Sequence, residues 1–358
     1  MGDLALVFVD LEGAQNNAPT KMVAKFSPIK TNTPTFIIKN VFGTEAHWYN
    51  DFLEEDQGFG RPEAYFIAAK LVHVRPWKRL PVFCMLFEAM PPAPYSRTSG
   101  CGNLDHLKAV MSVLGSFHAK WWNHPKQYPL NFLNHPTDYN SIGKNLVIAG
   151  AKLGLPALKQ CFGDVYAPVL EWTPLIRKHL KWFVDQVFTP PFTVCHGDVH
   201  LDNIFFNDEW PTGIKMIDFG NIQFGQGMFD VAYFMGTNIE PDLRRAHQDE
   251  LMQGYHAELV RGGVKGYSLD DCWRDYKLNL FRVLINIMFV TWTDFRKPHK
   301  NKTGIFAAEP TPKDAKLRAT YDAVNRRCAA SLVDAKFDEL LKSATPTCSV
   351  CCCCICCA

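Results

Sequence analysis

The chain has 358 residues, of which 47% are hydrophobic, so it can bury a sizeable core and is expected to form two lobes. Its formal net charge is only +2, and no basic tract is present, which argues against a nucleic-acid partner. The N-terminus lacks the features of a signal peptide, and polar residues interrupt the longest apolar stretch, 278–292, so we expect a cytoplasmic protein without a transmembrane segment.

The first predicted element is a β-hairpin. Two apolar runs that favour strands, 4–9 and 21–26, flank a long connection rich in turn residues. The two-residue period of a strand puts Lys25 on the same face as Val23. Lys25 would then point into a cleft if the sheet covers one; a solvated lysine on the strand is the alternative.

A helical pattern follows over residues 44–53, and Glu45 begins a face that is otherwise apolar and includes Trp48 and Tyr49. A carboxylate on a buried face needs a cationic partner, because an unpaired buried charge is costly. We therefore predict that Glu45 pairs with Lys25. The alternative is that Glu45 only interacts with the positive N-terminal end of its helix.

The apolar run 80–90 predicts a strand that ends at the proline-rich residues 91–94. We place the lobe boundary there, with an N-terminal lobe over 1–88, a C-terminal lobe over 89–342 and a tail over 343–358.

Apolar residues spaced three and four apart make the second lobe helical. The first of its helices begins near Leu104 and reaches Trp121, and we expect His118 on its apolar side to be a hydrogen-bonded packing residue. Further helices are predicted over 165–187, 242–261 and 269–295.

The most informative segment contains a second predicted hairpin, in which apolar runs at 204–206 and 214–217 flank a turn-rich stretch. Folding this hairpin sets Asn203 beside Asp218. An amide oxygen and a carboxylate are hard oxygen ligands of the kind that Mg²⁺ takes together with phosphate oxygens.

Asp198 lies on the loop before this hairpin, five residues ahead of Asn203. A carboxylate near the metal but outside its ligands is suited to accept a hydroxyl proton in phosphoryl transfer, whose catalysis depends on positioning and charge stabilisation. Capping of a turn is the alternative role for Asp198 alone, but the joint spacing with Asn203 and Asp218 favours catalysis.

These motifs resemble those of a known superfamily. His-Gly-Asp at 196–198, Asn203 and Ile-Asp-Phe-Gly at 217–220 are similar to the catalytic and metal loops of protein-kinase-like enzymes, in the form typical of aminoglycoside phosphotransferase and choline-kinase relatives. Residues 117–122 and 227–233 resemble stretches of the ecdysteroid-kinase-like (CHK kinase-like) members.

The resemblance implies an α+β, protein-kinase-like bilobal fold, with a small antiparallel sheet and one helix in the N-lobe and a larger, mainly helical C-lobe. It also implies an ATP-dependent, Mg²⁺-requiring kinase that phosphorylates a hydroxyl of a small molecule. The contacts that choose among amines, aminoglycosides, steroid alcohols and sugars are not visible in the sequence.

By the same resemblance, Asp198 would be the catalytic base, Asn203 and Asp218 would bind Mg²⁺, and His196 and Asp230 would support the loop. Lys25, positioned by Glu45, would hold the nucleotide phosphates, with Lys39 as the second candidate. The backbone that would contact the adenine edge is that of Phe87, Glu88, Ala89 and Met90.

Two other functions stay open. No Gly-x-Gly-x-x-Gly loop precedes Lys25, so the N-lobe is expected to lack its first strand and glycine loop, and a non-catalytic kinase-like module that binds ATP is one alternative. The other is a 2-His-1-carboxylate iron oxygenase, with His196 and Asp198 as ligands and His247 or His256 as the third. The helical patterns after residue 240 argue against the second alternative.

The cysteines divide into two groups. Six of the 13 are scattered without paired spacing, and we expect them to be reduced thiols. The other seven fall in the last eleven residues, in a low-complexity tail that we expect to be disordered. Lipidation and soft-metal binding by thiolates are the alternatives for this tail.

Overall fold

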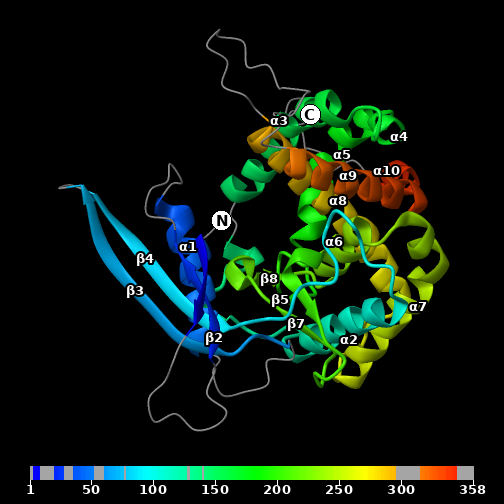
Figure 1. Cartoon of the computed structure of the whole chain (residues 1–358). Helices are drawn as coiled ribbons and strands as arrows, with labels where there is room; N and C mark the ends of the chain where they lie inside the picture. The colour runs from blue at the N-terminus through cyan, green and yellow to red at the C-terminus, as the bar shows by residue number, and fades with distance from the viewer. Residues whose placement is uncertain are drawn as a thin grey trace, which may run out of the picture.

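The structure is a computed structural model of the chain (Figure 1). The residues that it describes are 3–8, 20–27, 35–51, 60–75, 78–126, 130–138, 141–295 and 315–344. Residues 345–358 of the predicted tail, which include all of its cysteines, lie outside these ranges, and so do residues 1–2 and 9–19. The expectations about the tail and about the glycine loop fall on these residues.

An antiparallel sheet forms the N-terminal part of the molecule, with strand order β1-β2-β4-β3 (Figure 1). The predicted first hairpin is confirmed, and Leu6 of β1 is paired with Val23 of β2. The strand expected before the prolines is also present as β4. The long strand β3 was not predicted. The strands are β1 (Asp3–Phe8), β2 (Lys21–Phe26), β3 (Ala64–Arg75) and β4 (Lys78–Glu88).

A single helix, α1 (Thr35–Asp51), packs against β3 and β4. It begins nine residues before the predicted start at Thr44, so Lys39 lies in a helix and not on a strand as its candidacy required. The predicted apolar face is confirmed in its described part, because Trp48 and Tyr49 are buried.

The rest of the described chain is mainly helical (Figure 1). The helix α2 pairs with α7, and α8 packs against both α3 and α6. The buried stretch 278–292 belongs to α8, as predicted. The helices are α2 (Leu104–Lys120), α3 (Ser141–Phe162), α4 (Ala167–Leu170), α5 (Thr173–Val187), α6 (Met228–Asn238), α7 (Pro241–Arg261), α8 (Leu269–Asp294), α9 (Ala315–Asp334) and α10 (Phe337–Ser343).

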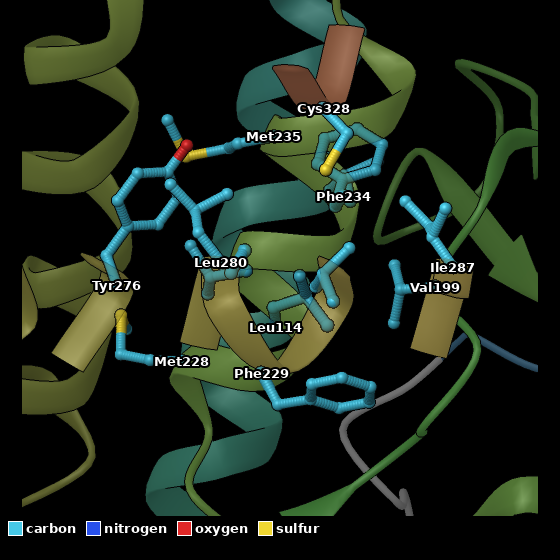
Figure 2. Close-up of a cluster of buried hydrophobic side chains, with 14 of the residues drawn as sticks. Leu114, Val199, Met228, Phe229, Phe234, Met235, Tyr276, Leu280, Ile287 and Cys328 are labelled. Carbon is cyan, nitrogen blue, oxygen red and sulfur yellow. The ribbon is translucent and has the colours of Figure 1, made fainter. Parts of the chain in front are cut away.

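Figure 2 shows the core around α6, where Phe229 and Phe234 lie among side chains from neighbouring helices. Leu114 of α2 and Leu280 of α8 belong to this cluster and are fully buried. Val199, from the loop that carries Asp198, is part of the same cluster. The candidate catalytic loop is therefore anchored directly in the main hydrophobic core.

Two small two-stranded sheets frame that loop. β5 (Thr193–Cys195) pairs with β8 (Gln223–Gly225). β6 (Ile204–Phe206) pairs with β7 (Ile214–Met216), which confirms the second predicted hairpin. A short 3₁₀ turn, η3 (Leu201–Asn203), connects the loop to β6.

The fold class is as predicted, with a small antiparallel sheet at the N-terminal end and a mainly helical remainder. None of the helices in the described part of the chain combines the length and the apolar character that a membrane crossing requires. The six cysteines within the described ranges are all unpaired, in agreement with the expectation of reduced thiols.

Candidate active site

The β6–β7 hairpin brings Asn203 next to the residue that precedes Asp218. Its register pairs Ile204 with Met216, and the Ile217 N–H donates to the Asn203 carbonyl over 3.0 Å. Asp218 is the next residue along the chain. The predicted reversal of the chain is therefore confirmed, and it brings Asn203 and Asp218 to the same end of the hairpin.

Asp218 has a left-handed backbone conformation, with φ of 67° and ψ of 61°. Few residues other than glycine adopt this conformation, and such positions often occur at functional sites. Its side chain is 35% exposed, and its Oδ1 lies 3.1 Å from the Lys25 ammonium nitrogen. Asp218 therefore joins the hairpin to the N-terminal sheet.

Lys25 of β2 also forms the predicted ion pair with Glu45 of α1. The Lys25 Nζ lies 2.9 and 2.7 Å from the two carboxylate oxygens of Glu45, whose side chain is only 2% exposed. Burial alone would lower the pKa of Lys25, but the carboxylates of Glu45 and Asp218 outweigh it and raise this pKa. Lys25 is therefore a fixed positive charge beside Asp218.

Phe219 and Gly220 carry the contact between the hairpin and α1. The buried Phe219 ring lies 5.5 Å from the Trp48 ring and 4.9 Å from the His196 ring, measured between centroids. A Cβ atom on Gly220 would come within 2.5 Å of a Val41 methyl group. The absence of a side chain at Gly220 thus lets α1 approach closely.

The backbone of the loop is held by Asp230 of α6. The buried carboxylate of Asp230 accepts the His196 N–H at 2.7 Å and the Gly197 N–H at 3.0 Å, the contact with the loop that was predicted. Gly197 has φ of +83°, and a Cβ atom there would lie 2.3 Å from the Asn221 carbonyl oxygen. His118 Nε2 lies 3.3 Å from Asp230, so His118 is a hydrogen-bonded packing residue, as expected.

Both ring nitrogens of His196 have partners in the protein. Nδ1 accepts the Asp198 N–H at 3.3 Å, so Nε2 carries the hydrogen that is donated to the Ile217 carbonyl at 3.0 Å. Burial lowers the pKa of His196, which keeps the ring neutral. Neither nitrogen is left for a metal, so this geometry removes the first ligand of the iron-oxygenase alternative. His256, one of its two candidate third ligands, is hydrogen-bonded to the Tyr267 carbonyl.

The Asp198 side chain is 25% exposed and is surrounded by polar groups. His200 Nε2 lies 3.5 Å from Asp198 Oδ1, and this carboxylate adds to the rise in the pKa of Tyr233 that burial causes. Burial alone would raise the pKa of Asp198, but the polar and basic side chains around it, including Arg97, lower it to about 2. Asp198 is therefore an ionised carboxylate at neutral pH.

The four predicted adenine-contacting residues differ in what their backbone can offer. Phe87 belongs to β4, and the Glu88 N–H already donates to the Glu63 carbonyl at 2.9 Å. The prolines that follow have no N–H. A backbone donor for a ligand in this segment must therefore come from Ala89 or Met90.

Two functional candidates were missed at the sequence level. Arg97 pairs with Asp202 of the loop, with Nε 2.7 Å from Oδ2, and the buried Arg327 of α9 donates to the Arg97 carbonyl. No sequence signal links α9 to this loop. Tyr233 follows Asp230 by three residues on α6, so helical spacing alone could have placed it on the same face.

The model of the ecdysteroid kinase-like family matches residues 4–264 of this chain. An uncharacterised protein from a Synechocystis strain is 32% identical over 69 residues. That match covers 19% of this chain and 19% of the relative, so it spans about a fifth of the curated protein.

Several solved structures are similar at low sequence identity. A microcompartment-associated aminopropanol kinase is 14% identical, with a TM-score of 0.44 over 94% of this chain and 93% of its own. A Plasmodium vivax ethanolamine kinase is 11% identical, with a TM-score of 0.45 over 88% and 75%. A putative aminoglycoside phosphotransferase from Ralstonia eutropha is 12% identical, with a TM-score of 0.47 over 95% and 94%.

Proposed function

The chain belongs to the ecdysteroid kinase-like family, and from this premise we propose that it is a small-molecule kinase that uses ATP and Mg²⁺. The observation that carries the proposal is the contact of Lys25 with both Glu45 and Asp218. It places one cation from the N-terminal sheet beside a carboxylate that follows the hairpin. Phosphoryl transfer requires a positive charge for the phosphate oxygens and a carboxylate ligand for the metal, and Lys25 and Asp218 would supply these two groups.

The nucleotide would bind between the lobes that we propose at 1–88 and 89–342. Lys25, held by the buried Glu45, would contact phosphate oxygens. The backbone of Ala89 and Met90 would face the adenine edge.

Asn203 and Asp218 have the donor set that suits Mg²⁺. Both offer hard oxygen atoms, and the Asn203 amide nitrogen is already turned toward the Asp198 carbonyl at 3.1 Å, which leaves its oxygen for a ligand. Bound Mg²⁺ would neutralise developing charge on the phosphates. The partly exposed Asp218 is accessible to such an ion.

Asp198 would orient the acceptor hydroxyl and accept its proton. With a pKa of about 2 it is ionised at neutral pH, so it can accept a hydrogen bond from that hydroxyl. The hydrogen bonds from Asp230 to the His196 and Gly197 amides fix the backbone on which Asp198 is presented. Loop rigidity matters here because catalysis of this type depends mainly on positioning.

A screen for ATP consumption tests this proposal. Purified protein with Mg²⁺ is assayed against amino alcohols, aminoglycosides, sterol alcohols and sugars, in parallel with Asp198→Asn and with Asp242→Asn as a surface control. We expect at least one class to stimulate ATP consumption, with kcat about 10²- to 10⁴-fold lower in Asp198→Asn and unchanged in the control. ATP binding without turnover on any class would favour the non-catalytic module, and equal turnover by Asp198→Asn would refute the assignment of the base.

A further inference from the structure

The side-chain amide nitrogen of Asn203 lies within hydrogen-bond distance of two groups in the loop. The amide nitrogen lies 3.1 Å from the Asp198 carbonyl oxygen, which can only accept. This contact fixes which end of the amide is nitrogen, because the opposite orientation would bring two oxygens together. The same nitrogen lies 3.2 Å from His200 Nε2.

One ring nitrogen of His200 therefore has two neighbours with opposite requirements. The Asn203 amide at 3.2 Å requires a bare Nε2, whereas the Asp198 carboxylate at 3.5 Å would favour a hydrogen on it. The amide contact is the shorter, and the carboxylate contact lies at the limit of a hydrogen bond. We therefore assign His200 the tautomer in which Nε2 accepts from Asn203. The ring hydrogen is then on Nδ1, which is buried and has no partner among the described residues.

The ring of His200 is held in place for this contact. His200 and Asn203 lie on the same turn, with the Asn203 N–H donating to the His200 carbonyl at 2.8 Å, and the His200 side chain is only 7% exposed. The Tyr233 ring meets it edge-on at 6.2 Å between centroids. The Asn238 side chain accepts the Leu201 N–H at 3.0 Å and so ties the turn to the end of α6.

From this geometry we propose that His200 is the positioning residue that turns the Asn203 oxygen toward a divalent cation shared with Asp218. The inference rests on the proposed function. With both amide hydrogens engaged, Asn203 can present only its oxygen to an ion. Residues that orient a metal ligand from behind typically contribute about 10- to 100-fold in metal affinity.

The test measures Mn²⁺ binding in the presence of ADP by electron paramagnetic resonance, because Mn²⁺ takes the same hard oxygen ligands as Mg²⁺. His200→Leu removes the acceptor and should raise the Kd for Mn²⁺ about tenfold or more, with ADP affinity in the absence of metal unchanged. His200→Gln keeps an acceptor oxygen near the place of Nε2 and should restore Mn²⁺ affinity to within a few-fold of the parent. His247→Leu, on the partly exposed face of α7, is the matched control and should behave like the parent.

Two results would overturn the role of His200 and leave the proposed function intact. One is an affinity of His200→Leu for Mn²⁺ equal to that of the parent, and the other is an affinity of His200→Gln for Mn²⁺ as low as that of His200→Leu. If the parent itself binds no Mn²⁺ with ADP, the proposed function and this inference fail together. Thermal unfolding shows whether each variant folds. If His200→Leu does not fold, His200→Met, which also lacks a strong acceptor, replaces it.

Discussion

The loop at 196–203 carries the candidate base Asp198 and the segment at 218–220 carries the candidate metal ligand Asp218, but the two carboxylates are held in different ways. Asp198 lies on backbone that Asp230 fixes with two hydrogen bonds, within the helical part of the molecule. Asp218 itself has a left-handed backbone conformation, and its Oδ1 contacts Lys25 of the N-terminal sheet. Asp198 is thus held within the helical part of the molecule, and Asp218 is held between that part and the N-terminal sheet.

This difference predicts two kinds of effect when residues around the two carboxylates are substituted. Changes around the loop should destabilise the protein and abolish turnover, because its anchors are fully buried. Changes around the second segment should first weaken the binding of nucleotide and metal, because its anchors come from β2 and α1. The following predictions test this separation, beginning with the largest effect.

Asp230→Asn should cause the largest loss. An amide in place of the carboxylate puts an NH₂ group where the loop amides now find an acceptor, and it leaves a buried N–H unpaired. We expect a loss of about 3 kcal/mol in the free energy of unfolding in urea, together with turnover reduced about 100-fold or more. Asp242→Asn on the surface of α7 is the control. A fully stable Asp230→Asn would show that the loop is held by other contacts.

Gly197→Ala should be nearly as damaging. Its φ of +83° disfavours any residue with a side chain, and the new Cβ would meet the Asn221 carbonyl oxygen at 2.3 Å. Urea unfolding should show a loss of about 2 kcal/mol or more. Gly254→Ala, a helix position with no atom within 4 Å of the added Cβ, should be neutral or slightly stabilising. Equal stability of the two variants would contradict the strain at Gly197.

Gly220→Ala should have a smaller effect of a different kind. The added methyl would press on the Val41 side chain at 2.5 Å and push α1 away from the hairpin. We expect weaker MgATP binding by calorimetry, about tenfold in Kd, with a stability loss of only about 1 kcal/mol. A variant that loses stability but binds MgATP normally would argue against a role of α1 docking in nucleotide binding.

The smallest effect concerns pH. The pKa of Asp198 is depressed to about 2, so its contribution to stability is present above the unfolded value near 4 and is lost as the pH falls toward 2. Between about pH 5 and pH 7, protonation of Asp198 should therefore not reduce kcat/KM. The measurement is the pH dependence of kcat/KM for the parent and for the residual activity of Asp198→Asn. A fall of the parent's kcat/KM below about pH 7 that is absent in Asp198→Asn would contradict this assignment.

Local patterns predicted much of the site. The second hairpin follows from two apolar runs around a turn, and the Lys25–Glu45 pair follows from one carboxylate on an apolar helix face. The contact of Asp218 with Lys25 joins two residues that are 193 positions apart in the sequence, and only the resemblance to a family linked them. The same limit hid the pairing of Arg97 with Asp202.

Some elements were missed because local propensity opposes them. The helix α3 contains three glycines and Pro156, which lower helix propensity, yet it forms where it packs against α8. A Cβ atom on Gly154 would come within 2.5 Å of Met288, so this glycine allows the close approach of the two helices. The partner α8 lies more than a hundred residues away in the sequence, and no local pattern could indicate it.

The central claim is that Lys25, Asn203 and Asp218 form one site for a nucleotide and its metal. Calorimetric titration of ATP with and without Mg²⁺ into the parent, Lys25→Met and Asp218→Asn tests it most directly. We predict Mg²⁺-dependent binding by the parent, weak binding by Lys25→Met under both conditions, and loss of the Mg²⁺ dependence in Asp218→Asn. Binding of ATP by the parent that is the same with and without Mg²⁺, and is unchanged in both variants, would contradict the claim.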